Sequence, residues 1–95
     1  MTQIVEQSFA SVWDAIADTP EEAENLRVRS ALMDKITALI SEKNWTQAQA
    51  AAQCQVTQPR ISDLLCGRIS RFSIDALVNM AWALGHRVHV ELEAA

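Results

Sequence analysis

The chain has 95 residues, of which 49% are hydrophobic and 21% charged, and its formal net charge at pH 7 is -4. This length and composition predict one globular domain, and no apolar run approaches the ~20 residues that a membrane-spanning helix needs. These properties exclude a membrane span, and because the first residues lack a basic, apolar leader we expect a cytoplasmic protein.

The charge is unevenly distributed along the chain. Residues 1–24 carry six acidic side chains and neither lysine nor arginine, whereas the remaining residues sum to +2. Within residues 1–18, the apolar side chains have the spacing of a short amphipathic helix: Phe9, Val12, Trp13 and Ile16. We expect residues 1–18 to form a separate acidic segment whose helix docks on the core or on a partner. A merely solvated acidic face explains the charge equally well.

Start and stop signals divide residues 19–85 into four further helices. The expected N-caps are threonine or serine residues: Thr19, Thr46, Thr57 and Ser73. The expected left-handed helix ends are asparagine or glycine residues: Asn44, Gly67 and Gly85. Together with the N-terminal helix, these signals predict an all-α fold of five helices.

Hydrophobic spacing also predicts which side chains the helices bury. We expect Ile61, Leu64 and Leu65 to face the core, since they follow the helical period after Thr57. We expect Trp45 and Trp82 to be core residues, because one precedes a helix cap and the other lies among apolar neighbours. No ligand pocket is indicated.

After Arg87 the sequence period changes to two. Val88, Val90 and Leu92 alternate with polar residues, which is the pattern of a half-buried strand. Because a helical chain offers this strand no edge, we expect Val88, Val90 and Leu92 to form a dimer interface by pairing with the same strand of a second subunit. A disordered tail is the alternative.

The two short helices around the connector Cys54-Gln55-Val56 have the layout of a helix-turn-helix. In this motif the second helix enters the DNA major groove and presents its N-terminal side chains to base edges. Gln58 can pair with adenine and Arg60 with guanine, while Pro59 can offer an apolar contact to a thymine methyl group. The other side chains expected at DNA lie in the same helix or contact phosphates near its ends: Thr57, Ser62, Asp63, Arg68, Arg71 and Ser73.

These residues also carry a resemblance to a known family. The pattern of the Cro/C1-type (XRE) helix-turn-helix family is matched by Thr46-Gln47, Ala51, Val56-Thr57-Gln58, Ile61-Ser62 and Gly67. The run from Thr57 to Gly85 resembles the branch that contains HigA-type antitoxins, and the likeness covers roughly residues 19–92. Two positions depart from the family: Gln55 stands where relatives have glycine, and Pro59 where they often have a polar residue.

The resemblance implies a five-helix fold and a homodimer that binds a near-palindromic operator and represses its own operon. It would place Gln47, Gln58, Pro59, Arg60 and Ser62 at or near DNA. In the antitoxin branch, the protein would also neutralise a small RelE-like ribonuclease. Since a toxin that binds RNA should be basic, we expect the acidic N-terminal segment to contact it, through Phe9, Val12, Trp13 and Ile16.

The sequence offers no sign of enzymatic chemistry. Cys54 and Cys66 are separated by eleven residues, which fits neither a redox motif nor a zinc ligand pair. His86 and His89 have no nucleophile or base arranged around them. We therefore expect neither a metal nor another cofactor. Two alternatives to the antitoxin stay open: a stand-alone phage-type or metabolic regulator, and a dimeric protein-interaction module that does not bind DNA.

Overall fold

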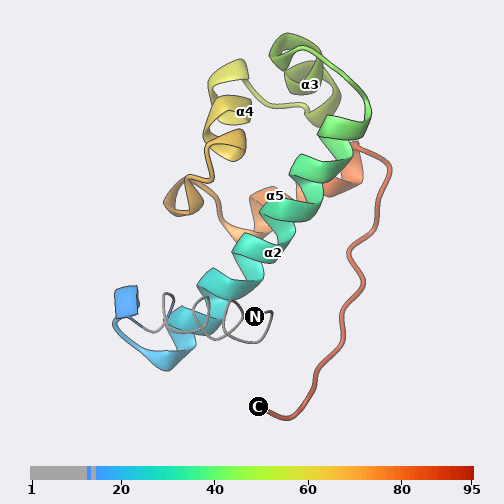
Figure 1. Ribbon diagram of the computed structural model, residues 1–95. Coiled ribbons are helices and arrows are strands. Elements are labelled where there is room, and N and C mark those ends of the chain that lie inside the picture. Colours follow the sequence, from blue (N-terminus) through green and yellow to red (C-terminus); the bar gives the residue numbers. More distant parts are fainter. Residues whose placement is uncertain (1–12, 14) are drawn as a thin grey trace, which may run out of the picture.

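The computed structural model describes residue 13 and residues 15–95, and this part of the chain is helical. Its elements are α2 (Pro20–Glu42), α3 (Gln47–Cys54), α4 (Gln58–Leu65), the 3-10 helix η1 (Ile69–Arg71) and α5 (Ile74–Ala83). The long α2 crosses the molecule; α5, η1 and α4 pack against it, and α3 packs against α4 and α5 (Figure 1). The predicted all-α fold is confirmed by these four α-helices.

The predicted N-terminal helix lies mostly outside the described residues, as do Phe9 and Val12. Of its members, Trp13, Ala15 and Ile16 are helical, and the Ala17 N–H donates to the Trp13 carbonyl over 3.0 Å. The Trp13 side chain is half-buried and Ile16 is exposed. The fifth helix is therefore not shown as a complete element. No helix in residues 15–95 is long and apolar enough to cross a membrane.

Three of the four predicted N-caps are confirmed by side-chain hydrogen bonds: Thr19 accepts from the Glu22 N–H, Thr46 from the Gln49 N–H and Ser73 from the Ala76 N–H. Thr57 occupies the N-cap position of α4, but its side chain makes no capping bond. The three confirmed caps all accept from the N–H of the third helical residue, which in α4 is Arg60. The Arg60 N–H donates to the Thr57 carbonyl over 3.1 Å instead.

The predicted left-handed helix ends are also confirmed, with φ of 55° at Asn44, 70° at Gly67 and 83° at Gly85. A fourth left-handed residue is Gln55, the C-cap of α3, with φ of 59°. It stands where the resembled family has glycine, and a side chain in this conformation costs roughly 1 kcal/mol. The fold therefore accepts strain in the turn that leads to α4.

The core joins α2 to the four following elements, and its fully buried side chains are Ile36, Ile61, Leu64, Phe72, Leu77 and Met80. Trp45 is half-buried and packs against this cluster, in keeping with its predicted core position. Two other core predictions are wrong. Trp82 is 68% exposed, because it lies roughly 140° around α5 from the buried Leu77. Leu65, the last residue of α4, is 41% exposed, roughly 100° around from Leu64.

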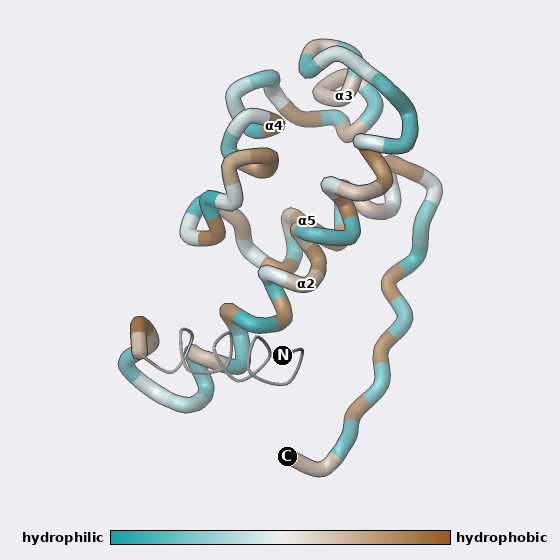
Figure 2. Tube along the Cα trace, viewed as in Figure 1, coloured by the Kyte–Doolittle hydropathy of each residue, from teal (hydrophilic) through white to brown (hydrophobic). Residues whose placement is uncertain are grey.

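The segment 86–95 follows α5 as an extended tail, along which hydrophobic and hydrophilic residues alternate (Figure 2). Val88 packs against the core, whereas Val90 is 74% and Leu92 is 96% exposed. No strand forms within residues 15–95, so the predicted C-terminal strand is not shown. A strand that pairs across a homodimer has no partner edge within one chain, and this pairing stays a prediction.

Candidate nucleic-acid interface

The turn between α3 and α4 fixes how these two helices meet. The Gln55 N–H donates to the Ala52 carbonyl over 3.4 Å, and the Val56 N–H donates to the Ala51 carbonyl over 3.0 Å. Val56 is half-buried and packs against the core. Because its backbone and side chain are both held, the first turn of α4 starts from a defined position against α3.

The first turn of α4 is open to solvent. Thr57, Gln58 and Pro59 are exposed, and among the described residues the Gln58 side chain has no hydrogen-bond partner. Of the other residues that the sequence places at DNA, Gln47, Arg68, Arg71 and Ser73 are exposed, Arg60 and Ser62 are half-buried, and Asp63 is buried. The structure thus brings exposed residues together at the start of α4 and in the loop after it.

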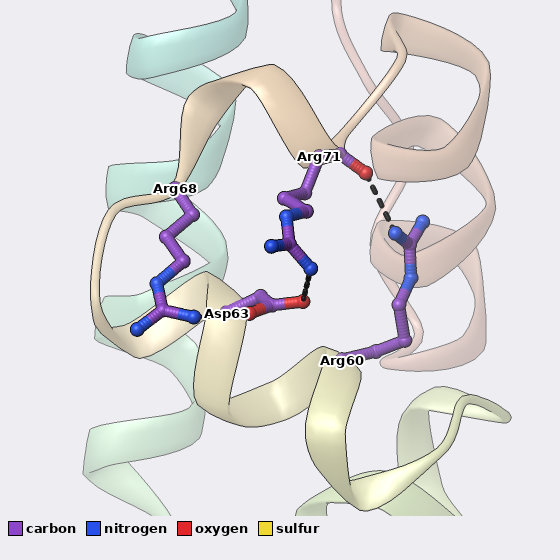
Figure 3. Close-up of polar contacts among 4 residues, drawn as sticks. All are labelled: Arg60, Asp63, Arg68 and Arg71. Atoms are coloured by element: carbon purple, nitrogen blue, oxygen red, sulfur yellow. Dashed lines mark hydrogen bonds and ion pairs between the residues drawn. The ribbon is translucent and has the colours of Figure 1, made fainter.

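Asp63 lies inward from the surface on which the sequence predicts it. Its carboxylate is 11% exposed and pairs with Arg68 over 3.2 Å and with Arg71 over 3.6 Å (Figure 3). The two arginine side chains remain 55% and 59% exposed. The carboxylate therefore neutralises part of their charge and holds them at the surface.

Arg60 is held on the other side of the same loop. Its Nη1 donates to the Arg71 carbonyl over 2.6 Å, as Figure 3 shows. The guanidinium carbon lies 4.5 Å from the centroid of the buried Phe72 ring, within the range of a cation–π contact. Arg60 therefore connects α4 to η1 as well as standing near the exposed first turn.

A further arginine, which the sequence analysis does not single out, supports η1 from α2. The Nη1 of Arg29 donates to the carbonyls of Ile69 and Phe72, each over 3.2 Å, while its Nε donates to Asn25 over 2.7 Å. The two carbonyls that accept from Arg29 belong to residues that lie 40 and 43 positions further along the chain. No local pattern links positions so far apart, so nothing in the sequence could have identified this contact.

We call the surface formed by Arg60, Arg68 and Arg71 the η1 surface. Residues 56–73 contain these three arginines and one acidic residue, Asp63. Residues 1–24, by contrast, contain six acidic residues and neither lysine nor arginine. On α2, the exposed Glu24 pairs with Arg27, which lowers the pKa of the glutamate. The η1 surface is thus a locally basic patch on an acidic protein.

The chemistry of this surface is suited to an anionic polymer. Guanidinium groups at fixed positions bind phosphate, and the exposed start of α4 adds the positive end of the helix dipole. No cluster that could hold a metal is found among the described histidine, cysteine and acidic residues. Burial raises the pKa of the Cys54 thiol, so this cysteine stays protonated and packs as an apolar side chain.

Comparison with known proteins agrees with this geometry. Residues 15–93 match a family model described as a helix-turn-helix domain. The match includes all four described α-helices and most of the tail. No curated protein matches the chain.

Proposed function

The chain belongs to the helix-turn-helix domain family, and we propose that it is a sequence-specific DNA-binding repressor that acts as a homodimer on a near-palindromic operator. Membership of the family already suggests a DNA-binding regulator. The observation that carries the proposal is the exposed first turn of α4 beside the η1 surface. Side chains that can read bases and side chains that can bind phosphate lie next to each other there.

In this proposal, Gln58 is the main base-reading residue. It is exposed in the first turn, and a glutamine side chain can donate to N7 of adenine and accept from the N6 amino group as a bidentate pair. Pro59, exposed beside it, can contact a thymine methyl group. Arg60 can read guanine with its remaining N–H groups or after its Nη1 leaves the Arg71 carbonyl.

Arg68, Arg71 and Ser73 are the proposed phosphate contacts. Arg68 and Arg71 keep more than half of their side-chain surface exposed while Asp63 restricts their orientation. Gln47, Thr57 and Ser62, which are exposed or half-buried near the same surface, complete the set. Such contacts position a protein on the duplex without reading sequence.

The first experiment measures the affinity of the purified chain for its own upstream DNA and for scrambled DNA across a salt series. If a dimer contacts about six phosphates, log affinity falls with log salt at a slope of roughly -5. Gln58→Ala should weaken the free energy of binding to the upstream DNA by about 1–3 kcal/mol and leave binding to the scrambled DNA unchanged. Arg68→Ala should weaken binding to both DNAs equally and reduce the slope by about 2, because each of the two protomers loses one phosphate contact.

Gln53→Ala is the matched control, since Gln53 is an exposed glutamine at the other end of the turn and is not placed at DNA. It should leave both affinities unchanged. Equal, weak binding of the wild type to both DNAs would overturn the proposal. The helix-turn-helix shape would then serve protein contacts, as in the alternative interaction module.

Within this function, we propose the antitoxin of a RelE-like toxin–antitoxin pair over a stand-alone phage-type or metabolic regulator. The support is the resemblance of residues 57–85 to HigA-type sequences and the acidic N-terminal segment. The described residues of its proposed toxin contact, Trp13 and Ile16, include an exposed isoleucine. Phe9 and Val12 belong to the same proposed contact.

Two observations separate these roles. A neighbouring reading frame that encodes a basic protein of about a hundred residues would support an antitoxin, because a toxin that binds RNA needs positive charge. Deletion of residues 1–18 should then abolish toxin neutralisation but leave operator binding in place. Intact neutralisation after this deletion would exclude the segment as the toxin contact.

A further inference from the structure

Trp82 is the most exposed aromatic side chain in the described part of the molecule. It is 68% exposed on α5, and Val78, which is 38% exposed, lies one turn before it. Residues four apart share one face of a helix, so the two side chains are neighbours. This face is turned away from Leu77 and Met80, which α5 buries in the core. Adjacent large apolar side chains on a surface indicate an interaction site.

A shallow cavity of ≈ 440 Å³ lies beside Trp82. Ala76, Asn79 and Ala83 of α5 line it on one side, and the Cys54–Val56 turn lines it on the other. We call this cavity, together with Val78 and Trp82, the α5 face. It therefore includes the turn that positions α4.

The charges at the two ends of α5 are opposite. Asp75 is exposed in the first turn of the helix, and His86 and Arg87 are exposed just after its end. Neither Asp75 nor Arg87 forms an ion pair within residues 15–95. A surface that is negative at one end, apolar in the middle and positive at the other end complements a second copy of itself in antiparallel orientation.

We infer that a second copy of this chain covers the α5 face, so that two α5 helices pack antiparallel across a two-fold axis. Trp82 of each copy enters the cavity of the other, and Asp75 of each copy meets Arg87 of the other. Such an interface is isologous, because the same patch serves both subunits. The inference rests on the proposed homodimer and identifies the surface that forms its centre.

The size of the interface requires more than the two helices. A stable dimer buries about 1,200–2,000 Å² in total, and α5 has only ten residues. The tail begins directly after α5, and its exposed Val90 and Leu92 lie within the segment predicted to pair across the dimer. The α5 face and the paired tails therefore form one continuous interface, with Trp82 at the centre and the tails extending it.

This arrangement links dimer formation to DNA binding. A Trp82 side chain from the partner copy that fills the cavity packs against Gln55 and Val56, which precede α4. The dimer contact then supports the left-handed turn at Gln55 and holds α4 in position. Dimerisation thus stabilises the turn as well as bringing two recognition helices to one operator.

The first test measures the molar mass of the full chain by sedimentation equilibrium without DNA. The wild type should be a dimer, and Trp82→Glu should raise the dimer dissociation constant by at least about 30-fold, as expected for a buried tryptophan at the centre of an interface. Leu65→Glu is the control, because Leu65 is 41% exposed at the end of α4, outside the α5 face. Circular dichroism checks that both variants remain folded.

The second test uses charge reversal. Asp75→Arg and Arg87→Asp should each weaken the homodimer, because like charges then meet twice across the two-fold axis. Mixing the two variants should restore dimers, since both contacts of the mixed dimer join opposite charges. A monomeric wild type, a Trp82→Glu variant that dimerises normally or a mixture that stays monomeric would overturn the inference. None of these results depends on DNA, so loss of DNA binding would be recognised separately.

Discussion

The η1 surface and the α5 face differ in how their exposed side chains are held. On the η1 surface, Arg68 and Arg71 pair with Asp63, and Arg60 donates to the Arg71 carbonyl. On the α5 face, Trp82 projects from the helix with 68% of its surface exposed. One surface is arranged by contacts within the chain, whereas the other has its largest side chain in water.

The difference follows from the physical cost of each arrangement. A flexible arginine loses side-chain entropy when it binds phosphate, so anchoring it in the free protein lowers the cost of binding. An exposed tryptophan recovers the free energy of its apolar surface only when another surface covers it. The η1 surface is therefore ready to bind a ligand, while the α5 face is completed by association.

The largest expected effect concerns the support of the η1 surface. Arg29→Ala should lower the free energy of unfolding by about 2 kcal/mol, because the carbonyls of Ile69 and Phe72 lose a charged donor. Arg27→Ala is the control on the same helix. Its pair with Glu24 is exposed on both sides, so solvent screens it and its loss should change stability little. Urea denaturation at one fixed protein concentration measures both variants. Equal losses would show that η1 does not depend on α2 for its position.

A smaller effect is expected from the acidic residue that orders the arginines. Asp63→Asn keeps the size of the side chain but removes the charge that faces Arg68 and Arg71. The free energy of unfolding should fall by about 1 kcal/mol, because the arginines are more than half exposed and solvent screens the two ion pairs. Asp34→Asn, an exposed position on α2, should change stability by less than about 0.5 kcal/mol. Unchanged stability of Asp63→Asn in the same denaturation series would mean that these arginines are not anchored.

The parts of this molecule that the sequence predicted are those controlled by local rules. Helix starts at Thr19, Thr46 and Ser73 and the left-handed ends at Gly67 and Gly85 depend on residues within one turn. Each uses a backbone group that a nearby side chain or an unusual φ can satisfy. The helix boundaries were therefore readable without knowledge of the tertiary fold.

The parts that the sequence missed depend on packing between distant segments. Leu65 and Trp82 belong to apolar runs, but which side of each helix meets the core is decided by the neighbouring helices, mainly α3 for α4 and α2 for α5. Arg29 and Asp63 are ordinary charged residues until the fold brings η1 next to them. The sequence thus predicts which residues form the candidate site, while the partners of its charged groups required the structure.

The smallest expected effect lies at Gln55, where the turn before α4 meets the cavity of the α5 face. Gln55→Gly should raise the free energy of unfolding by about 0.5 kcal/mol, since removal of the left-handed strain exceeds the extra entropy of glycine in the unfolded chain. Asn44→Gly is the matched comparison. Asn44 is also left-handed, with φ of 55°, but asparagine tolerates this conformation, so its replacement should gain less.

Gln53→Gly, two residues earlier in α3, tests whether glycine itself stabilises this region. It should cost about 1 kcal/mol, because Gln53 is inside the helix. If Gln55→Gly instead destabilises the protein, the glutamine side chain makes contacts that outweigh its backbone strain. Because that side chain lines the cavity, repeating the measurement below the dimer dissociation constant would show whether those contacts come from the second copy.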